Sequence, residues 1–145
     1  MTMAVLFRWL HVLAAILAVG AVLYQRIAVL PAIAECLDAA SQAKVRDRLA
    51  ARWRVPLMVA IAALLGSGLY NFVTVSLPKA RSAPSYHMLF GIKFVLALVV
   101  FFLASALVGR SPRFAAMRAD GRKWAGVTAV LAVAIVLLSG ILKNL

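Results

Sequence analysis

The chain has 145 residues, of which 66% are hydrophobic and only 14% are charged, with a mean hydropathy of +1.01. This composition excludes an ordinary soluble domain of the same length and predicts an integral membrane protein. The net charge of +12 does not indicate a nucleic-acid partner, because the basic residues fall between apolar segments. We expect them to set the topology and to contact the anionic headgroups of the lipid bilayer.

Four apolar segments are long enough to cross a hydrocarbon core of about 30 Å, which takes roughly 20 helical residues. They cover about residues 4–30, 55–77, 86–108 and 125–142. We therefore expect an all-α fold, an integral membrane four-helix antiparallel bundle, as a single domain over residues 1–145. The first segment is interpreted as a retained span, because no cleavage site followed by a polar domain is evident. Pro31 is expected to end the regular part of this span.

Charge predicts the orientation of the spans. The connections 35–54 and 109–124 carry five lysines and arginines each, whereas the connection between the second and third spans carries only Lys79 and Arg81. By the positive-inside rule, both basic connections face the cytoplasm and both termini lie outside, in a bacterial inner membrane. Residues 32–54 are expected to be helical, either extending the neighbouring spans or lying on the inner surface as a basic amphipathic helix.

Polar side chains from all four spans fall at one depth in the outer half of the predicted bundle. His11 lies roughly 10 Å below the outer end of the first span, and His87 lies near the outer end of the third. The other spans contribute Tyr70, Asn71, Ser139 and Gly140. This convergence predicts a site.

Helical spacing predicts which way these residues face. His11 shares its face with small residues, whereas bulky aliphatic residues occupy the opposite face, so His11 is expected to point into the bundle. The small residues are Ala14, Ala15 and Ala18, and the bulky ones include Leu13, Ile16 and Leu17.

The third span has two candidate faces, rotated by roughly 120°. One carries His87, Gly91, Phe94 and Leu98, and the other carries Tyr86, Lys93, Ala97 and Ala104. Both cannot meet the same neighbour, so this span either contacts two partners or extends Lys93 along the helix.

Each ionisable residue allows a functional and a structural interpretation. His11 is a candidate metal or heme ligand, or a buried histidine that is hydrogen-bonded to a serine or asparagine on a neighbouring helix. His87 is also a candidate ligand, or a histidine that lies at the membrane interface. Lys93 either extends toward the headgroups or serves as a ligand, an anion partner or a proton-handling group. Arg8, Lys79 and Arg81 would contact heme propionates or headgroups, and Arg26 is expected to be an interfacial anchor. Met1, Met3 and Met88 offer soft ligands for Cu(I) near His87.

The predicted spans contain no acidic residue and no cysteine pair, which excludes several kinds of site within the membrane. All four acidic residues lie in or near the predicted cytoplasmic connections, which excludes paired-carboxylate chemistry and a di-iron carboxylate bundle within the membrane. The single cysteine, Cys36, cannot form an intramolecular disulfide.

Three short motifs resemble the copper resistance protein D family: LHVLAAILAVGAVLY in the first span, GSGLY in the second and YHMLFGIKF at the start of the third. Tyr86 and Lys93 have the seven-residue spacing of that family. The sequence is also similar to the HemJ-type protoporphyrinogen oxidases, whose first-span histidine and third-span lysine match His11 and Lys93. This resemblance implies a four-helix membrane protein that binds heme.

The leading hypothesis is a b-type heme protein for electron transfer or heme-linked oxidation, with His11 as an axial ligand and His87 or Lys93 on the other side. Tyr86 and Asn71 would complete the cofactor site, and Ala14, Ala15, Ala18 and Gly91 would make room for the macrocycle. A redox partner or a quinone and a homo-oligomer are compatible partners, and whether the chain is an enzyme stays open. The alternatives are a copper-handling protein that uses His11, His87 and Met88, and a structural subunit of a membrane complex.

Overall fold

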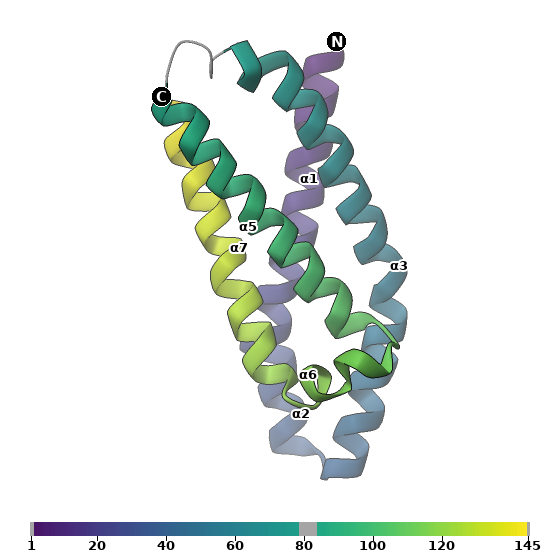
Figure 1. The fold of residues 1–145 in the computed structure, drawn as a ribbon. Coiled ribbons are helices and arrows are strands. Elements are labelled where there is room, and N and C mark those ends of the chain that lie inside the picture. Colours follow the sequence, from purple (N-terminus) through teal and green to yellow (C-terminus); the bar gives the residue numbers. More distant parts are fainter. Residues whose placement is uncertain (1, 79–83, 145) are drawn as a thin grey trace.

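The structure is a computed structural model, in which residues 2–78 and 84–144 are described. The predicted all-α class is confirmed, since no strand occurs among these residues. The long helices lie side by side (Figure 1). The helical elements are α1 (Met3–Tyr24), η1 (Gln25–Val29), α2 (Leu30–Cys36), α3 (Ala39–Asn71), η2 (Phe72–Ser76), α5 (Pro84–Val108), η3 (Pro112–Phe114), α6 (Ala115–Ala119) and α7 (Gly121–Asn144).

Four helical stretches are long and apolar enough to cross a membrane. They are Met3–Cys36, Ala39–Ser76, Pro84–Val108 and Gly121–Asn144, and all four predicted spans fall almost entirely within them. Many of their large apolar side chains point away from the protein: Leu13 is 65% exposed and Leu137 is also 65% exposed. Such an apolar outer surface is compatible with contact with a lipid bilayer.

Pro31 does not end the first helix, so that prediction is wrong. The helical path runs through the π-helical segment η1 and continues in α2 to Cys36. In this wider turn the Leu30 N–H donates to the Gln25 carbonyl, five residues back. Proline lacks an N–H and crowds the preceding turn, and the widened turn accommodates it.

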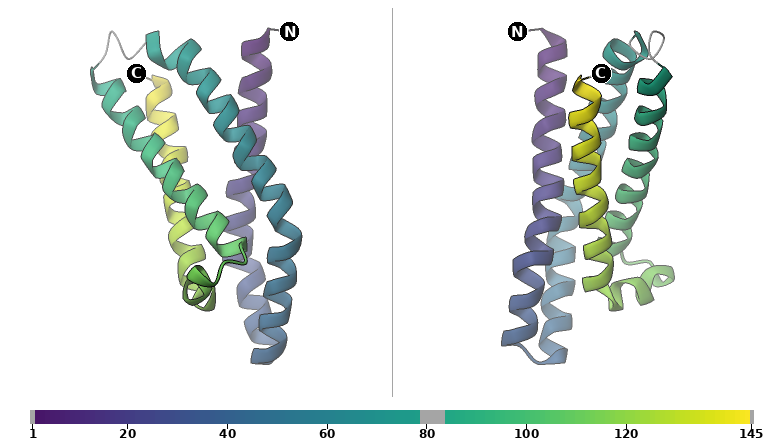
Figure 2. Two further views of the ribbon diagram at one scale, coloured as in Figure 1. Left: turned by 45° about the vertical axis from the view of Figure 1, so that its right-hand side comes forward. Right: turned by 90° about the vertical axis from the view of Figure 1, so that its left-hand side faces the viewer.

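The predicted basic connection 35–54 is helical and extends the neighbouring spans. α2 continues the first span, and α3 begins at Ala39 and passes through Pro56 without a break. The α2–α3 pair therefore reaches beyond the adjacent ends of α5 and α7 (Figure 2).

The four long helices pack in a closed ring: α1 contacts α3, α3 contacts α5, α5 contacts α7, and α7 contacts α1. Both termini lie at one end, opposite the α2–α3 turn (Figure 1). Small residues dominate the buried positions, and they allow helices to approach closely. These residues are Ala14, Ala60, Ser67, Ala104, Ala106, Ala125, Thr128, Ala129 and Ala132. Larger side chains form a separate core of Leu57 and Val108 with Ala104.

Arg26 does more than anchor an interface. Its guanidinium packs against Gly126 of α7, where an added Cβ would lie 3.1 Å from Arg26 Nε. The Nε atom is buried there without a hydrogen-bond partner among the described residues. Gly126 therefore permits the close approach of η1 to α7.

Two arginines bind backbone carbonyls at the end of α5. Arg54 Nε and Nη2 donate to the Val108 carbonyl at 3.0 and 2.7 Å. Arg118 donates to the carbonyls of Ala106 at 3.4 Å and Ser111 at 2.8 Å. The last carbonyls of a helix lack intrahelical partners, and cations are favoured beside them. These arginines thus fasten α3 and α6 to the end of α5, besides any contact with headgroups.

We predict that Arg54→Ala lowers the free energy of unfolding by about 1.5–3 kcal/mol, because the Val108 carbonyl loses a charged donor. Thermal unfolding in detergent micelles measures this change. Arg52→Ala removes an exposed arginine from the same helix and serves as the matched control. Equal destabilisation by both variants would contradict the prediction.

The start of α3 predicts a dependence on pH. Asp38 precedes the helix and accepts a hydrogen bond from the Ser41 N–H at 3.4 Å. Hydrogen bonds from the Ser41 side chain, and then from its backbone, lower the pKa of the Asp38 carboxyl from its ordinary value of 3.8. A lowered pKa in the folded state means that this stabilisation is present above the ordinary value and is lost as pH falls through the lowered one.

We therefore expect acidification through this range to lower the protection of the first turn of α3 against amide exchange, measured relative to the intrinsic exchange rate at each pH. Asp38→Ala should show low protection already at neutral pH, with no further loss of protection in acid. Asp47→Ala, which removes a carboxylate further along the same helix, should behave like the wild type. Slow exchange in the Asp38→Ala variant at neutral pH would refute the capping role.

Candidate functional site

His11 lies on the inward face of α1, as the helical spacing predicts. Its Nδ1 is 2.8 Å from the Oγ of Ser67 on α3, so the two helices are joined by a side-chain hydrogen bond. An added Cβ at Gly68 would lie 3.5 Å from His11 Cε1, so this glycine leaves the ring ordinary contact distance. No hydrogen bond joins His11 Nε2 to another described residue. The ring is thus held on one side and has a free nitrogen on the other.

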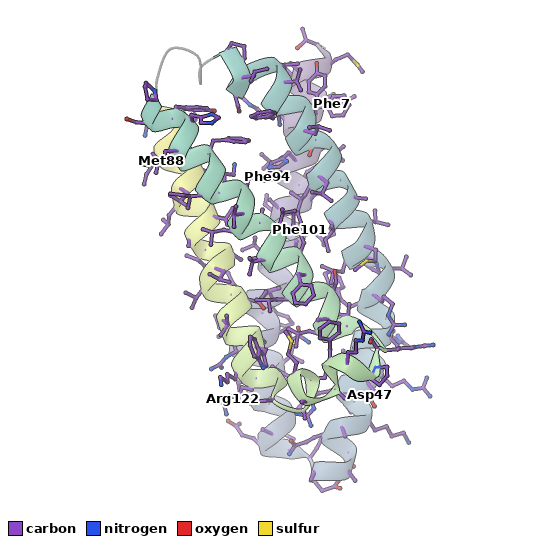
Figure 3. All side chains as sticks on the ribbon, viewed as in Figure 1. Phe7, Asp47, Met88, Phe94, Phe101 and Arg122 are labelled. Atoms are coloured by element: carbon purple, nitrogen blue, oxygen red, sulfur yellow. The ribbon has the colours of Figure 1, made fainter. Side chains whose placement is uncertain are left out.

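Lys93 of α5 is the charged residue that the fold brings to His11. It is half-buried, and the two residues interact electrostatically. Among the described residues no acidic side chain pairs with Lys93. The acidic side chains lie toward the opposite end of the molecule, as the position of Asp47 shows in contrast to Phe7 (Figure 3). The cation therefore lacks a counter-ion within the described protein.

The structure resolves the choice between the two faces of α5. Tyr86 and Ala104 are buried and Lys93 is half-buried, so their face is the inward one. His87 is exposed, together with the residues that share its face, Gly91, Phe94 and Leu98. The expected pairing of His87 with His11 across the bundle is therefore not what the fold provides. The described residues also contain no group of three or more His, Cys, Asp or Glu side chains that would hold a metal ion.

Tyr86 is buried, but its partner is η2 rather than His11. Its hydroxyl donates to Ser76 Oγ at 3.0 Å. Its ring stacks with Phe90 at 6.4 Å between centroids, and Phe90 stacks with Phe72 at 4.9 Å. Tyr86 thus ties the start of α5 to the end of the second long helical stretch.

Asn71 borders a small hollow of about 150 Å³ at the end that holds the termini. The hollow is lined by Ala4, Val5, Arg8, Asn71 and Val75. Asn71 is half-buried and Arg8 is exposed. Arg8 is one helical turn from His11.

Phe7 and Tyr70 close the α1–α3 contact in this region, with their rings stacked at 4.2 Å between centroids. The hollow and the His11–Ser67 pair thus lie on the same two long helical stretches.

The methionines do not assemble a soft metal site in the described structure. Met3 and Met88 are each 62% exposed, on α1 and α5. Met1, Lys79 and Arg81, which the sequence also suggested for metal or propionate contacts, lie outside the described residues.

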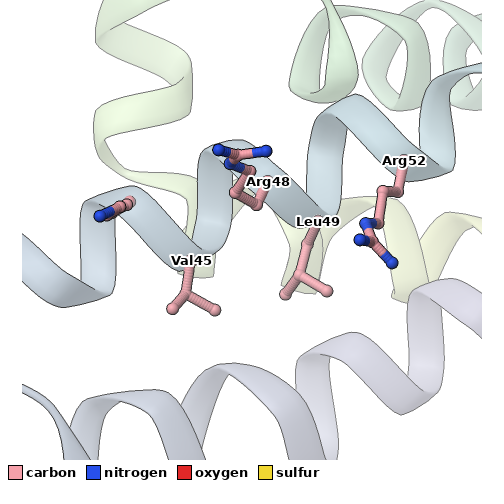
Figure 4. Close-up of a pocket in the computed structure, with 5 residues that line it drawn as sticks. Val45, Arg48, Leu49 and Arg52 are labelled. Carbon is pink, nitrogen blue, oxygen red and sulfur yellow. The ribbon is translucent and has the colours of Figure 1, made fainter.

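A larger hollow, of about 460 Å³, lies along the part of α3 that extends beyond α5 and α7 (Figure 4). Lys44, Val45, Arg48, Leu49 and Arg52 line it. It contains no nucleophile, acid or imidazole, and it is far along the helix from Ser67. We assign it no chemistry.

The sequence favours a serine or asparagine as one alternative partner of His11, but it does not single out Ser67, nor Ser76 as the partner of Tyr86. The available signal was weak: Ser67 is four residues after Ala63 and seven after Ala60, on a face of small residues. That pattern predicts an inward serine. It does not predict which side chain of another helix meets it.

No protein family matches the chain, and no curated protein or solved structure is significantly similar to it.

We predict that Tyr86→Phe lowers the free energy of unfolding by about 0.5–1.5 kcal/mol, because a buried hydroxyl bond to Ser76 is lost. Thermal unfolding in detergent tests this value. Tyr24→Phe is the control, since Tyr24 is exposed. An unchanged stability of Tyr86→Phe would show that the Ser76 contact contributes nothing.

Proposed function

We propose that this chain is a multi-pass protein of the bacterial inner membrane, an antiparallel four-helix bundle with both termini outside, that binds b-type heme through His11. The four long apolar helices and their apolar outer surface support the membrane placement. The termini lie together at one end, and the basic α2–α3 extension lies at the other (Figure 2). The positive-inside rule assigns that basic end to the cytoplasm.

The observation that carries the heme proposal is the free Nε2 of an inward imidazole. His11 is held through Nδ1 by Ser67, which leaves Nε2 with no hydrogen bond to a described residue. One imidazole is sufficient for a b-type heme, because the porphyrin supplies the other four nitrogen ligands. Cu(I) needs several soft protein ligands, and Met3 and Met88 are exposed on separate helices. The available ligand atoms therefore favour heme over copper.

His87 is left out of this site, because it lies on the outward face of α5. Lys93 and Arg8 are the cations near His11, and we assign them to the heme propionates. The hollow beside Arg8 and Asn71 is about 150 Å³, which is too small for a whole macrocycle. The proposal therefore requires that lipid or a second copy of the chain covers part of the heme.

A bound heme would supply one-electron chemistry, and the chain would tune it. His11 would hold the iron in place, and the apolar helices would lower the local dielectric and exclude water. Electrons would pass to a redox partner or a quinone. The resemblance to the HemJ-type oxidases supports this proposal, because His11 and Lys93 match their first-span histidine and third-span lysine.

A second candidate function is a structural subunit of a membrane complex. The His11–Ser67 hydrogen bond favours it, because a buried pair of this kind can join two helices without binding any ligand.

The test is the visible spectrum of the protein purified in mild detergent, oxidised and reduced with dithionite, with metal analysis of the same sample. We expect the visible absorption of b-type heme in the wild type, with a shift on reduction, loss of that absorption in His11→Ala, and its retention in the matched control His87→Ala. A colourless, iron-free wild type would overturn the heme proposal. Copurified copper would then support metal handling, and the absence of both metals would support a structural subunit.

A further inference from the structure

Ser67 is fully buried and lies among three groups that compete for its single hydroxyl proton. Its Oγ is 2.8 Å from His11 Nδ1. It also contacts the Ala63 carbonyl four residues back and lies 3.4 Å from the Leu64 carbonyl. Both carbonyl oxygens can only accept a hydrogen bond.

The position of that proton follows from the surroundings of both side chains. If the hydroxyl donated to His11, its oxygen would meet the Ala63 oxygen with no hydrogen between them, which is repulsive. The imidazole would then carry its own proton on Nε2, where no described residue accepts it. If the hydroxyl instead donates to the Ala63 carbonyl, as serines in helices often do, its lone pair faces Nδ1 and both problems disappear.

We infer that Ser67 is a positioning residue that fixes the tautomer of His11, with the proton on Nδ1 and the lone pair on Nε2. The imidazole Nδ1–H donates to Ser67 Oγ, and Ser67 Oγ–H donates to the Ala63 carbonyl. Groups that hydrogen-bond the second nitrogen of a ligating histidine fix its tautomer and its orientation in this way. The role of Ser67 in ligand binding rests on the proposed function, whereas the tautomer itself does not.

The surroundings hold the ring as well as the proton. Ser67 and Gly68 are consecutive residues of α3, and Gly68 leaves ordinary contact distance for the Cε1 edge of the imidazole. The edge that carries Nδ1 and Cε1 is thus engaged by one side of α3, so the free Nε2 points away from the serine.

The tautomer can be measured without any cofactor. The chain contains only two histidines, so ¹⁵N-histidine labelling of cofactor-free protein in detergent, with long-range ¹H–¹⁵N correlation, yields two ring systems. The His87→Ala variant leaves only the His11 signals. At a pH where the ring is neutral, we expect a protonated Nδ1 and a bare Nε2.

Ser67→Ala should remove the preference and give averaged nitrogen shifts, whereas Ser67→Thr, which keeps the hydroxyl, should retain it. Ser76→Ala is the matched control, because it removes another buried serine hydroxyl of the same helical stretch that does not contact His11. A wild type that is protonated on Nε2, or a Ser67→Ala spectrum identical to the wild type, would overturn the inference. Ser67→Thr adds a methyl group at a fully buried position and can prevent folding. In that case the comparison of Ser67→Ala with the wild type is sufficient to test the inference.

The heme titration of the same variants separates the two proposals. If both hold, Ser67→Ala lowers heme affinity about 10- to 100-fold, and Ser76→Ala leaves it unchanged. If no variant binds heme but His11 has the expected tautomer, the proposed function fails and the inference stands. If heme binds through His11 and Nε2 is protonated in the cofactor-free protein, the inference fails and the proposed function stands.

Discussion

The close approach of α1 and α3 is the constraint on which the rest of the structure depends. His11 of α1 and Ser67 of α3 meet at 2.8 Å, and Gly68 of α3 leaves the imidazole ring ordinary contact distance. A bulky residue in place of Gly68 would push the ring away and leave His11 Nδ1 without its serine partner, which costs free energy in an apolar interior. The same packing leaves the large aliphatic side chains on the outer surface.

Charge is distributed so that the two ends of the bundle differ. At the basic end, Arg54 and Arg118 bind the last carbonyls of α5, so part of the positive charge stabilises the fold itself. Near His11, Lys93 has no acidic partner among the described residues. Lys93 therefore leaves an uncompensated positive charge beside the imidazole.

Some features followed from the sequence because they are local. Span length, the inward face of α1 and the grouping of Tyr86 with Lys93 all depend on helical periodicity, which a single segment specifies. Pro31 is a local feature with a different outcome from the predicted one. The π-helical turn before it accommodates the missing N–H and the bulk of the proline ring, so the helix continues. Helical periodicity also groups the residues of α5 into the two faces that the structure contains. It does not determine which of these faces points into the bundle.

The sequence by itself determined that the chain forms four long apolar helices and which residues share a face on each, since these properties depend on composition and on the fixed rise and turn of a helix. Only the tertiary structure decided which faces meet. It turned Lys93 inward and His87 outward, and it paired His11 with a serine 56 residues away. The physical reason is that each helix contacts two others in the bundle. Which of its faces is buried therefore depends on the side chains of its neighbours, and the sequence of one helix alone does not specify it.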